Sequence, residues 1–173
     1  MADGAEEVTA ILARLADDLD AGFVDLFRAY QRIVYSTALG VCRRPADAED
    51  VTAEAFLHAY RALRGYDRRR IAALQPRAWL VTIMLNAWRN TGRTTLRRPR
   101  QVPLDEAVDP PDRSDSVERI VERHETGREL AALLARLPEA QRVAVVLRHV
   151  GGLSIAEVAA AADADPLPPG GPL

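Results

Sequence analysis

Apolar residues recur at three- and four-residue steps along much of this chain, which is the pattern of amphipathic helices. The first clear helix is broken near Pro45, and its apolar stripe consists of Phe23, Phe27, Tyr30, Val34, Ala38 and Val41. A second helix is predicted from Asp47, which can cap free amide protons, to about Arg64. Because the chain has no long alternation of apolar and polar residues, strands are not expected. The pattern therefore predicts an all-α fold.

A third helix is predicted from Pro76 to about Thr91, and its two faces differ in chemistry. At roughly 100° per residue, its apolar side is centred on Leu80, Met84 and Ala87. The opposite side carries Thr82, Asn86, Arg89 and Arg93, flanked by Trp79 and Asn90. Arginine and asparagine can form paired hydrogen bonds with bases or phosphates, and tryptophan can stack on a base. This face suits nucleic acid, although the helix alone is equally compatible with a merely solvated polar surface.

The placement of charge favours the nucleic-acid interpretation of the third helix. The chain has 23 basic and 25 acidic side chains, so its formal charge is only −2, and any affinity for phosphate must come from a local cluster. Basic residues dominate from residue 64 to 100, and acidic residues dominate from 101 to 129. A basic loop is predicted at residues 66–75, and further arginines lie at the start of the third helix and after its end. Together these arginines form the local cluster that favours nucleic acid: Arg68, Arg69, Arg70, Arg77, Arg97, Arg98 and Arg100.

Prolines divide the chain into two helical parts. Pro99, Pro103, Pro110 and Pro111 disfavour a helix, so a linker is predicted at about residues 99–115. We expect two small helical domains joined by a Pro-rich acidic linker. The predicted organisation is an acidic N-terminal segment (1–20), a helical domain (21–98), a linker region (99–127), a second helical domain (128–162) and a Pro/Gly-rich disordered tail (163–173).

The second domain has the pattern of an incomplete helix-turn-helix. A helix predicted at 139–150 is closed by Gly151 and Gly152, and Ser154 with Glu157 has the spacing of a capping box that opens the next helix. In a helix-turn-helix the following helix reads DNA. Residues 163–173 instead contain four prolines and two glycines, which cannot form that helix. A frameshift or a truncated gene would produce this change, and a natural short variant is the alternative.

Several function classes are excluded by the sequence. A single cysteine, Cys42, gives neither a disulfide framework nor a cysteine-based zinc site, and His58, His124 and His149 lack metal-ligand spacing. There is no Gly-rich phosphate loop and no apolar run near the ~18 residues of a membrane helix. The acidic first twenty residues are unlike a secretory signal. We therefore expect a cytoplasmic protein that is not an enzyme and has no metal or cofactor.

Four segments carry a resemblance to a known family. In order they are FVDLFRAYQRIVYSTALGV, DAEDVTAEAFLHAYRAL, RAWLVTIMLNAWRNTGR and LARLPEAQRVAVVLRHVGGLSIAEVA. Over about residues 21–98 and 128–162 they resemble the extracytoplasmic-function sigma factors, small specificity subunits of bacterial RNA polymerase. The resemblance implies a region 2-like domain that binds core polymerase and the promoter −10 element, and a partial region 4-like domain. Region 4 normally reads the −35 element, so impaired −35 recognition is expected here.

The resemblance also implies roles for particular residues. The segment AEDVTAEAF is similar to the family helix that grips the polymerase β′ clamp, which implies core contacts at Asp50, Glu54, His58 and Arg61. The loop 66–77 and the helix 78–93 are similar to the −10 reader, which captures a base that leaves the stack. The implied DNA contacts are Arg68, Arg69, Arg70, Arg77, Trp79, Thr82, Asn86, Arg89, Asn90 and Arg93. For Trp79, packing that orients the loop is favoured over base stacking.

The leading hypothesis is a transcription initiation factor with RNA polymerase core and promoter DNA as partners and an anti-sigma factor as a further candidate partner. A decoy or defective sigma factor, which binds polymerase or an anti-sigma factor without initiating, is the alternative. A helix-turn-helix regulator that binds duplex DNA alone ranks lowest, because the helix-turn-helix is the incomplete part and the intact basic surface lies in the other domain.

Overall fold

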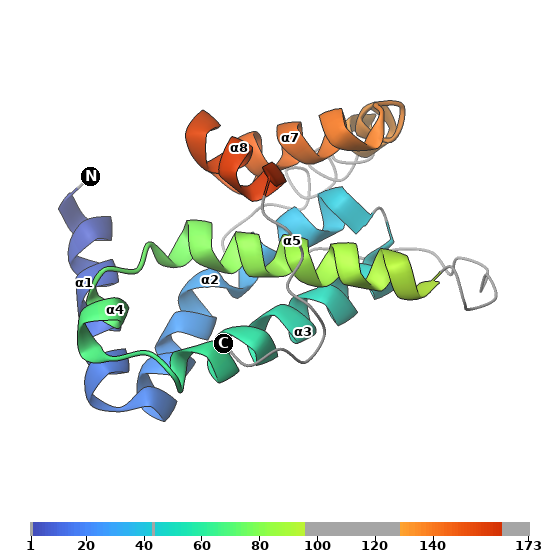
Figure 1. The fold of residues 1–173 in the computed structure, drawn as a ribbon. Helices are drawn as coiled ribbons and strands as arrows, with labels where there is room; N and C mark the ends of the chain where they lie inside the picture. Colours follow the sequence, from blue (N-terminus) through green and yellow to red (C-terminus); the bar gives the residue numbers. More distant parts are fainter. Residues whose placement is uncertain (1, 43, 96–128, 164–173) are drawn as a thin grey trace, which may run out of the picture.

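The computed structural model describes residues 2–42, 44–95 and 129–163, and side chains within 5–42, 44–91 and 129–162. Regular structure in these ranges is helical throughout, which confirms the all-α prediction (Figure 1). The helices are α1 (Ala2–Asp17), α2 (Leu19–Cys42), α3 (Pro45–Leu63), α4 (Arg68–Ala72), α5 (Pro76–Thr95), α7 (Glu139–His149) and α8 (Ile155–Asp163). Residues 129–135 are helical as well. Arg97, Arg98 and Arg100, the predicted linker region at 99–127 and residues 164–173 lie outside the described residues. The predicted disordered tail began at Asp163, but Asp163 is the last residue of α8.

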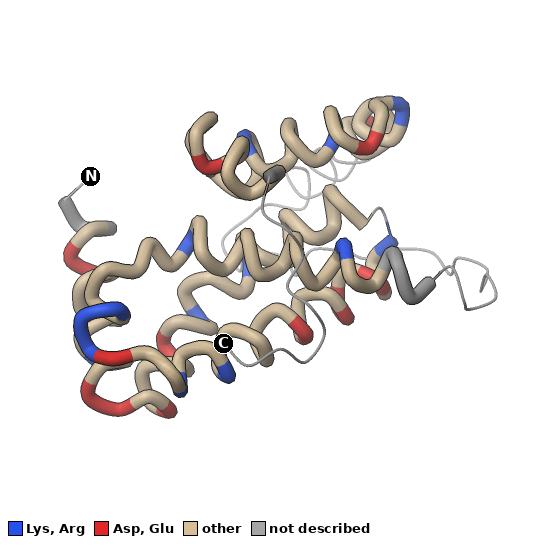
Figure 2. The backbone as a smooth tube through the Cα atoms, in the orientation of Figure 1, with Lys and Arg blue, Asp and Glu red and all other residues tan. Residues whose placement is uncertain are grey.

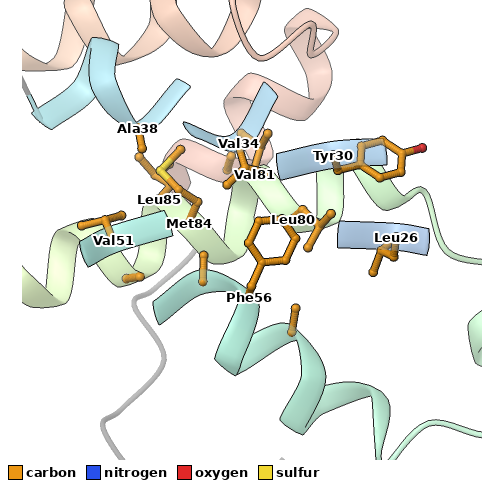
Figure 3. Packing of buried hydrophobic residues seen from close by; sticks show 14 of the residues in the cluster. Leu26, Tyr30, Val34, Ala38, Val51, Phe56, Leu80, Val81, Met84 and Leu85 are labelled. Carbon is orange, nitrogen blue, oxygen red and sulfur yellow. The ribbon is translucent and has the colours of Figure 1, made fainter. Parts of the chain in front are cut away.

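The core forms where α2, α3 and α5 pack against one another. Figure 3 shows Val34 and Ala38 of α2, Phe56 of α3, and Leu80 and Met84 of α5 converging in this space. The predicted α2 stripe is buried from Tyr30 to Val41, but Phe27 is 39% exposed and Leu26 takes the inward position instead. The α1 helix packs on α2 as well, so α2 meets neighbouring helices on more than one side.

Prolines set where two of these helices begin. Pro76 opens α5 as predicted, and Pro45 opens α3 two residues before the predicted start, because a first-turn residue needs no amide donor. Asp47 is therefore not the N-cap of α3, which was the prediction. It lies in the first turn, where its Oδ2 is 3.5 Å from Nε of the N-cap residue Arg44.

The acidic N-terminal segment contains a helix that was not predicted. Ile11, Leu12 and Leu15 of α1 are buried, and the helix contacts both α2 and α4. At the α1–α2 contact, a Cβ added to Gly22 would lie 2.4 Å from the backbone nitrogen of Leu15, so only glycine permits this approach. The buried apolar residues of α1 and the glycine of α2 thus hold α1 closely against α2.

The second helical part packs directly on the first. Val146 and Leu147 of α7, Leu153 of the turn and Ala161 of α8 share one continuous cluster of buried residues with the core of α2, α3 and α5. The capping box is confirmed: the Ser154 N–H donates to Glu157 Oε2 (2.7 Å), and the Glu157 N–H donates to Ser154 Oγ (3.2 Å). In Figure 1, α7 and α8 lie on one side of α5, and α3 lies on the other.

Candidate nucleic-acid and polymerase interface

The basic stretch after α3 contains a short helix, which corrects the prediction of a loop over residues 66–75. Asp67 is the N-cap of α4, and its Oδ1 accepts a hydrogen bond of 2.7 Å from the Arg70 N–H. Because this hydrogen bond satisfies an amide group at the start of the helix, it stabilises a helical turn relative to a loop. Arg68, Arg69 and Arg70 form the exposed first turn of α4, seen as a continuous blue segment in Figure 2.

Two of these three arginines have partners within the chain. Arg68 Nη2 lies 2.7 Å from Oδ1 of Asp17 at the end of α1, and both side chains are exposed. The Arg70 guanidinium lies 3.8 Å from the centroid of the Tyr66 ring, a cation–π contact. The Tyr66 ring is in turn 6.1 Å from the half-buried ring of Trp79. Trp79 thus packs beside the ring that holds Arg70.

Asn86 is buried, and the prediction that it forms part of an open polar ridge is wrong. Its exposed fraction is 7%, and within the described part of the chain its Oδ1 accepts no hydrogen bond. The reason is that α5 is buried on more than one side: Val81 and Leu85 are as fully buried as Leu80 and Met84. Helices α2, α3 and α8 all pack on α5, so α5 keeps a narrower polar face than its own periodicity predicts.

The other predicted residues of α5 lie in different environments. Thr82 is half-buried, and its hydroxyl donates to the Ala78 carbonyl (2.8 Å). Asn90 is also half-buried, and the Arg93 side chain lies outside the described residues. Arg89 donates from Nη1 to the Ala161 carbonyl (3.0 Å) and from Nη2 to the Ala162 carbonyl (3.1 Å). Arg77, exposed near the start of α5, lies against Gly152. The structure therefore gathers the predicted DNA-contact residues along α4 and α5, but not on one open face.

The predicted polymerase-contact residues do share one face of α3. Asp50 and Arg61 are exposed, and Glu54 Oε1 lies 3.8 Å from Nε2 of the half-exposed His58. Figure 2 shows acidic segments recurring along α3. At roughly 100° per residue, positions 50, 54, 57 and 61 fall within about 60° of one another. Together these residues form a mixed-charge stripe open to solvent.

Sequence reasoning missed the apolar centre of this stripe. Leu57 is 56% exposed and lies between Glu54 and Arg61 on the same face. On the neighbouring helix α2, Val24 and Phe27 are also exposed, and the Phe27 ring lies 4.8 Å from the Phe56 ring of α3. The sequence does contain a signal for this apolar position: a leucine stands three residues after Glu54, on a helix face whose other residues are charged. Apolar surface with charged residues around it is typical of a protein-binding site.

Tyr60, one turn after Phe56, joins α3 to the start of α2. Its hydroxyl donates to Asp20 Oδ1 at 2.6 Å, and its ring lies 5.1 Å from that of Phe23. The hydrogen bond to the Asp20 carboxylate is the main cause that raises the pKa of Tyr60. These contacts fix α2 and α3 side by side, so Phe27 and Leu57 are held on a rigid pair of helices.

Neither a metal centre nor a membrane span is found among the residues that the structure describes. Within these residues, no three His, Cys, Asp or Glu side chains come together in a way that could hold a metal ion. Likewise, none of the described helices has the length and apolar character needed to cross a membrane.

Comparison with known proteins bears on both helical parts. Residues 26–98 match Sigma-70 region 2, and residues 127–163 match Sigma-70, region 4. The ECF RNA polymerase sigma factor SigM of Mycobacterium tuberculosis (strain ATCC 25618 / H37Rv) is 33% identical over 149 residues, which cover 86% of this chain and 69% of SigM. The chain belongs to the ECF sigma factors. SigK of Mycolicibacterium vanbaalenii, another ECF sigma factor, is 29% identical over 157 residues, covering 88% of this chain and 76% of SigK.

As an ECF sigma factor, the protein is a DNA-binding transcription initiation factor and not an enzyme, and it binds core RNA polymerase and promoter DNA. The region 2 match contains α3, α4 and α5, so both candidate surfaces fall inside it. The region 4 match contains α7 and α8.

Proposed function

We propose that this ECF sigma factor anchors to the β′ clamp of RNA polymerase through α3 and opens the promoter −10 element with α4 and α5. The observation that carries the proposal is Leu57, a leucine that is 56% exposed in the middle of the charged stripe of α3. Exposed leucines at the centre of a mixed-charge patch fit a protein partner better than they fit solvent.

The polymerase contact combines attraction with burial. Asp50 and Glu54 provide acidic charge that steers a basic partner and sets its orientation, whereas Leu57 provides apolar area whose burial adds affinity. Ala53, which is exposed on α3, offers a partner no side-chain hydrogen bond. Leu57 and the exposed Phe27 therefore supply the apolar area that this contact buries.

The DNA contact is centred on the exposed turn of α4. In this proposal Arg68 and Arg69 meet phosphates of the separated strand, and the Arg70–Tyr66–Trp79 group, whose two rings are half-buried, lies beside them. Capture of a base that has left the stack offsets an unstacking cost of a few kcal/mol. Asn86 is not an open contact in this arrangement, because its side chain is buried.

The proposal also covers −35 recognition, the site of action and a third partner. Direct −35 recognition is weak in this proposal, because the residues after α8 are rich in proline and glycine. The site of action is the cytoplasm, where RNA polymerase works, and an anti-sigma factor is a candidate third partner.

A second candidate function, a decoy that binds polymerase without initiating, is favoured by one observation. Arg89, a predicted DNA contact, is engaged with the carbonyl groups at the end of α8. If that engagement were permanent, α5 would be unable to use Arg89 on DNA.

Transcription by purified core polymerase separates the two functions. Core enzyme, this protein and a pool of randomised promoter templates should give transcripts whose start sites share a sequence motif. Glu54→Arg should reduce the yield by weakening core binding, whereas Glu49→Arg, which reverses a charge on another face of α3, should not. If the protein only inhibits transcription by another sigma factor, the decoy function is correct and initiation is wrong.

A further inference from the structure

The arginine turn of α4 is too short to be stable by itself. The helix spans five residues, and isolated helices of fewer than about 12 residues are marginal in water. Locally it is stabilised by the cap from Asp67 and by the contact of Arg70 with the Tyr66 ring. Ile71 is the one residue of α4 that is buried. Most of the stability of α4 therefore comes from what packs around Ile71.

The helix that packs on α4 is α1. Figure 1 shows the two side by side near the N-terminal end of the fold. At one end of this contact, Oδ1 of Asp17 lies 2.7 Å from Nη2 of Arg68. At the other end, Val8 lines the same hollow as Leu74, which follows α4. The two segments therefore run in opposite directions, and the middle of α1 faces the middle of α4.

Leu12 and Ile71 occupy these middle positions. Leu12 is 7% exposed and Ile71 is 4% exposed, and both belong to one cluster of buried residues. The ion pair between Asp17 and Arg68 is exposed on both sides, and such pairs contribute little to stability. Apolar packing by Leu12, and not the ion pair, is thus the main support that α1 gives to α4.

Helix α1 is itself fixed on α2, so it can act as a rigid support. Arg14 Nη1 of α1 lies 3.3 Å from Asp25 Oδ2 of α2. Between the two helices, Asp18 Oδ1 accepts a hydrogen bond of 3.1 Å from the Ala21 N–H. With Gly22 packed directly against the backbone of α1, these contacts hold α1 in one position on α2.

We propose that α1 is a brace for α4: through Leu12 it holds the arginine turn in the helical conformation that binds a separated promoter strand. The brace rests on the proposed role of α4 in DNA binding. It assigns a positioning role to a helix that ends at Asp17, before the region 2 match begins at residue 26. A site that is ordered for only a fraction of the time binds with an affinity reduced by that fraction. Loss of the brace should therefore weaken DNA binding, although α1 itself need not touch DNA.

Leu12→Ala tests the brace, because it removes apolar contact and leaves every charge in place. Leu12→Met keeps nearly the same volume, so this conservative variant should behave like the wild type. Val51→Ala is the matched control for a cavity elsewhere in the core. Val51 is 1% exposed and lies near the start of α3, far from the end of α3 that leads to α4.

Three measurements on the full chain distinguish a brace from general stability. Amide hydrogen exchange over residues 68–74 reports order in α4, and fluorescence anisotropy with a mixed-sequence single strand of about 20 nucleotides reports DNA affinity. Titration of labelled core polymerase reports the contact made by α3. We expect Leu12→Ala to speed exchange in α4 by about tenfold and to raise the Kd for the strand by about fivefold, with the Kd for core polymerase unchanged. Val51→Ala should lower the unfolding temperature but leave exchange in α4 and the Kd for the strand near their wild-type values.

The brace is overturned if Leu12→Ala leaves exchange in α4 unchanged, or speeds that exchange without weakening single-strand binding. It is also overturned if Leu12→Ala weakens core polymerase binding as much as strand binding, because that is the result of a general loss of the fold. If Leu12→Ala does not fold, Leu12→Val, which removes fewer atoms, is judged by the same outcomes.

Failure of the proposed function gives a different result from failure of the brace. If α4 does not bind DNA, changing Arg68, Arg69 and Arg70 together to alanine leaves the affinity for the single strand unchanged. If only the brace is wrong, that triple change still weakens strand binding, whereas Leu12→Ala does not.

Discussion

Replacing Leu57 with alanine should weaken polymerase binding without weakening the fold. Full burial of a leucine side chain stabilises a complex by about 1.5–3 kcal/mol. Leu57 is 56% exposed in the free protein, so roughly half of this, about 0.8–1.7 kcal/mol, is still to be gained on binding. With 1.4 kcal/mol for each factor of ten, Leu57→Ala should raise the Kd for core polymerase by about 4- to 16-fold.

The assay is titration of fluorescently labelled core polymerase with the purified protein, together with thermal unfolding of each variant. Leu133→Ala is the matched control, because Leu133 is 59% exposed but lies in the second helical part, away from α3. Both variants should unfold at nearly the wild-type temperature, and only Leu57→Ala should lose affinity. Equal affinities for the two variants would refute the assignment of α3 as the polymerase contact.

Three further perturbations follow from the structure. Asn86→Leu should raise the free energy of unfolding by about 1–3 kcal/mol, because it removes a buried acceptor that has no partner among the described residues; destabilisation on thermal unfolding would contradict this. Burial, aided by Asp47, raises the pKa of Cys42 from 9.0 to about 12, which stabilises the protonated thiol. At pH 8 the thiolate fraction of Cys42 is then about 1,000-fold lower than that of a free thiol, although a thiolate of higher pKa is also more nucleophilic. Alkylation of Cys42 at pH 8 should therefore run roughly 50-fold slower than alkylation of a free thiol, and its rate should keep rising up to about pH 12. A rate that levels off near pH 9 would contradict the raised pKa. Changing Arg68, Arg69 and Arg70 together to alanine should make the slope of log K against log salt concentration for single-strand binding shallower by about 2, and an unchanged slope would exclude α4 from the DNA contact. Asp17→Asn, which frees Arg68, should tighten binding by less than about fivefold.

Local sequence signals predicted the helices and several of their ends. Pro76 at the first position of α5 and the Ser154–Glu157 capping box each act within one helical turn, so a single sequence contains all the information they need. The α1 helix was missed because the first twenty residues were interpreted from their acidic charge, and the apolar residues Ile11, Leu12 and Leu15 were not recognised as one side of a helix. These three residues are buried because α2 and α4 lie beside them.

The errors at the candidate site come from contacts between distant segments. Asn86 lies on the polar side of its own helix, and only the packing of α5 on several sides makes that side buried. Arg89 contacts Ala161 and Ala162, more than 70 residues away, which helix periodicity cannot reveal. Leu57 was missed for the opposite reason: a leucine is usually assigned to the core, and exposure on a charged stripe is visible only in three dimensions.

The central claim is that α4 and α5 hold separated promoter strands while α3 binds polymerase. Permanganate footprinting of a promoter selected from the randomised pool tests it directly, because permanganate oxidises unpaired thymines. Reactive thymines should appear in the −10 element only when core polymerase and this protein are both present, and they should fade when Arg68, Arg69 and Arg70 are changed to alanine. Full reactivity with the triple variant, or none with the wild-type protein, would contradict the account.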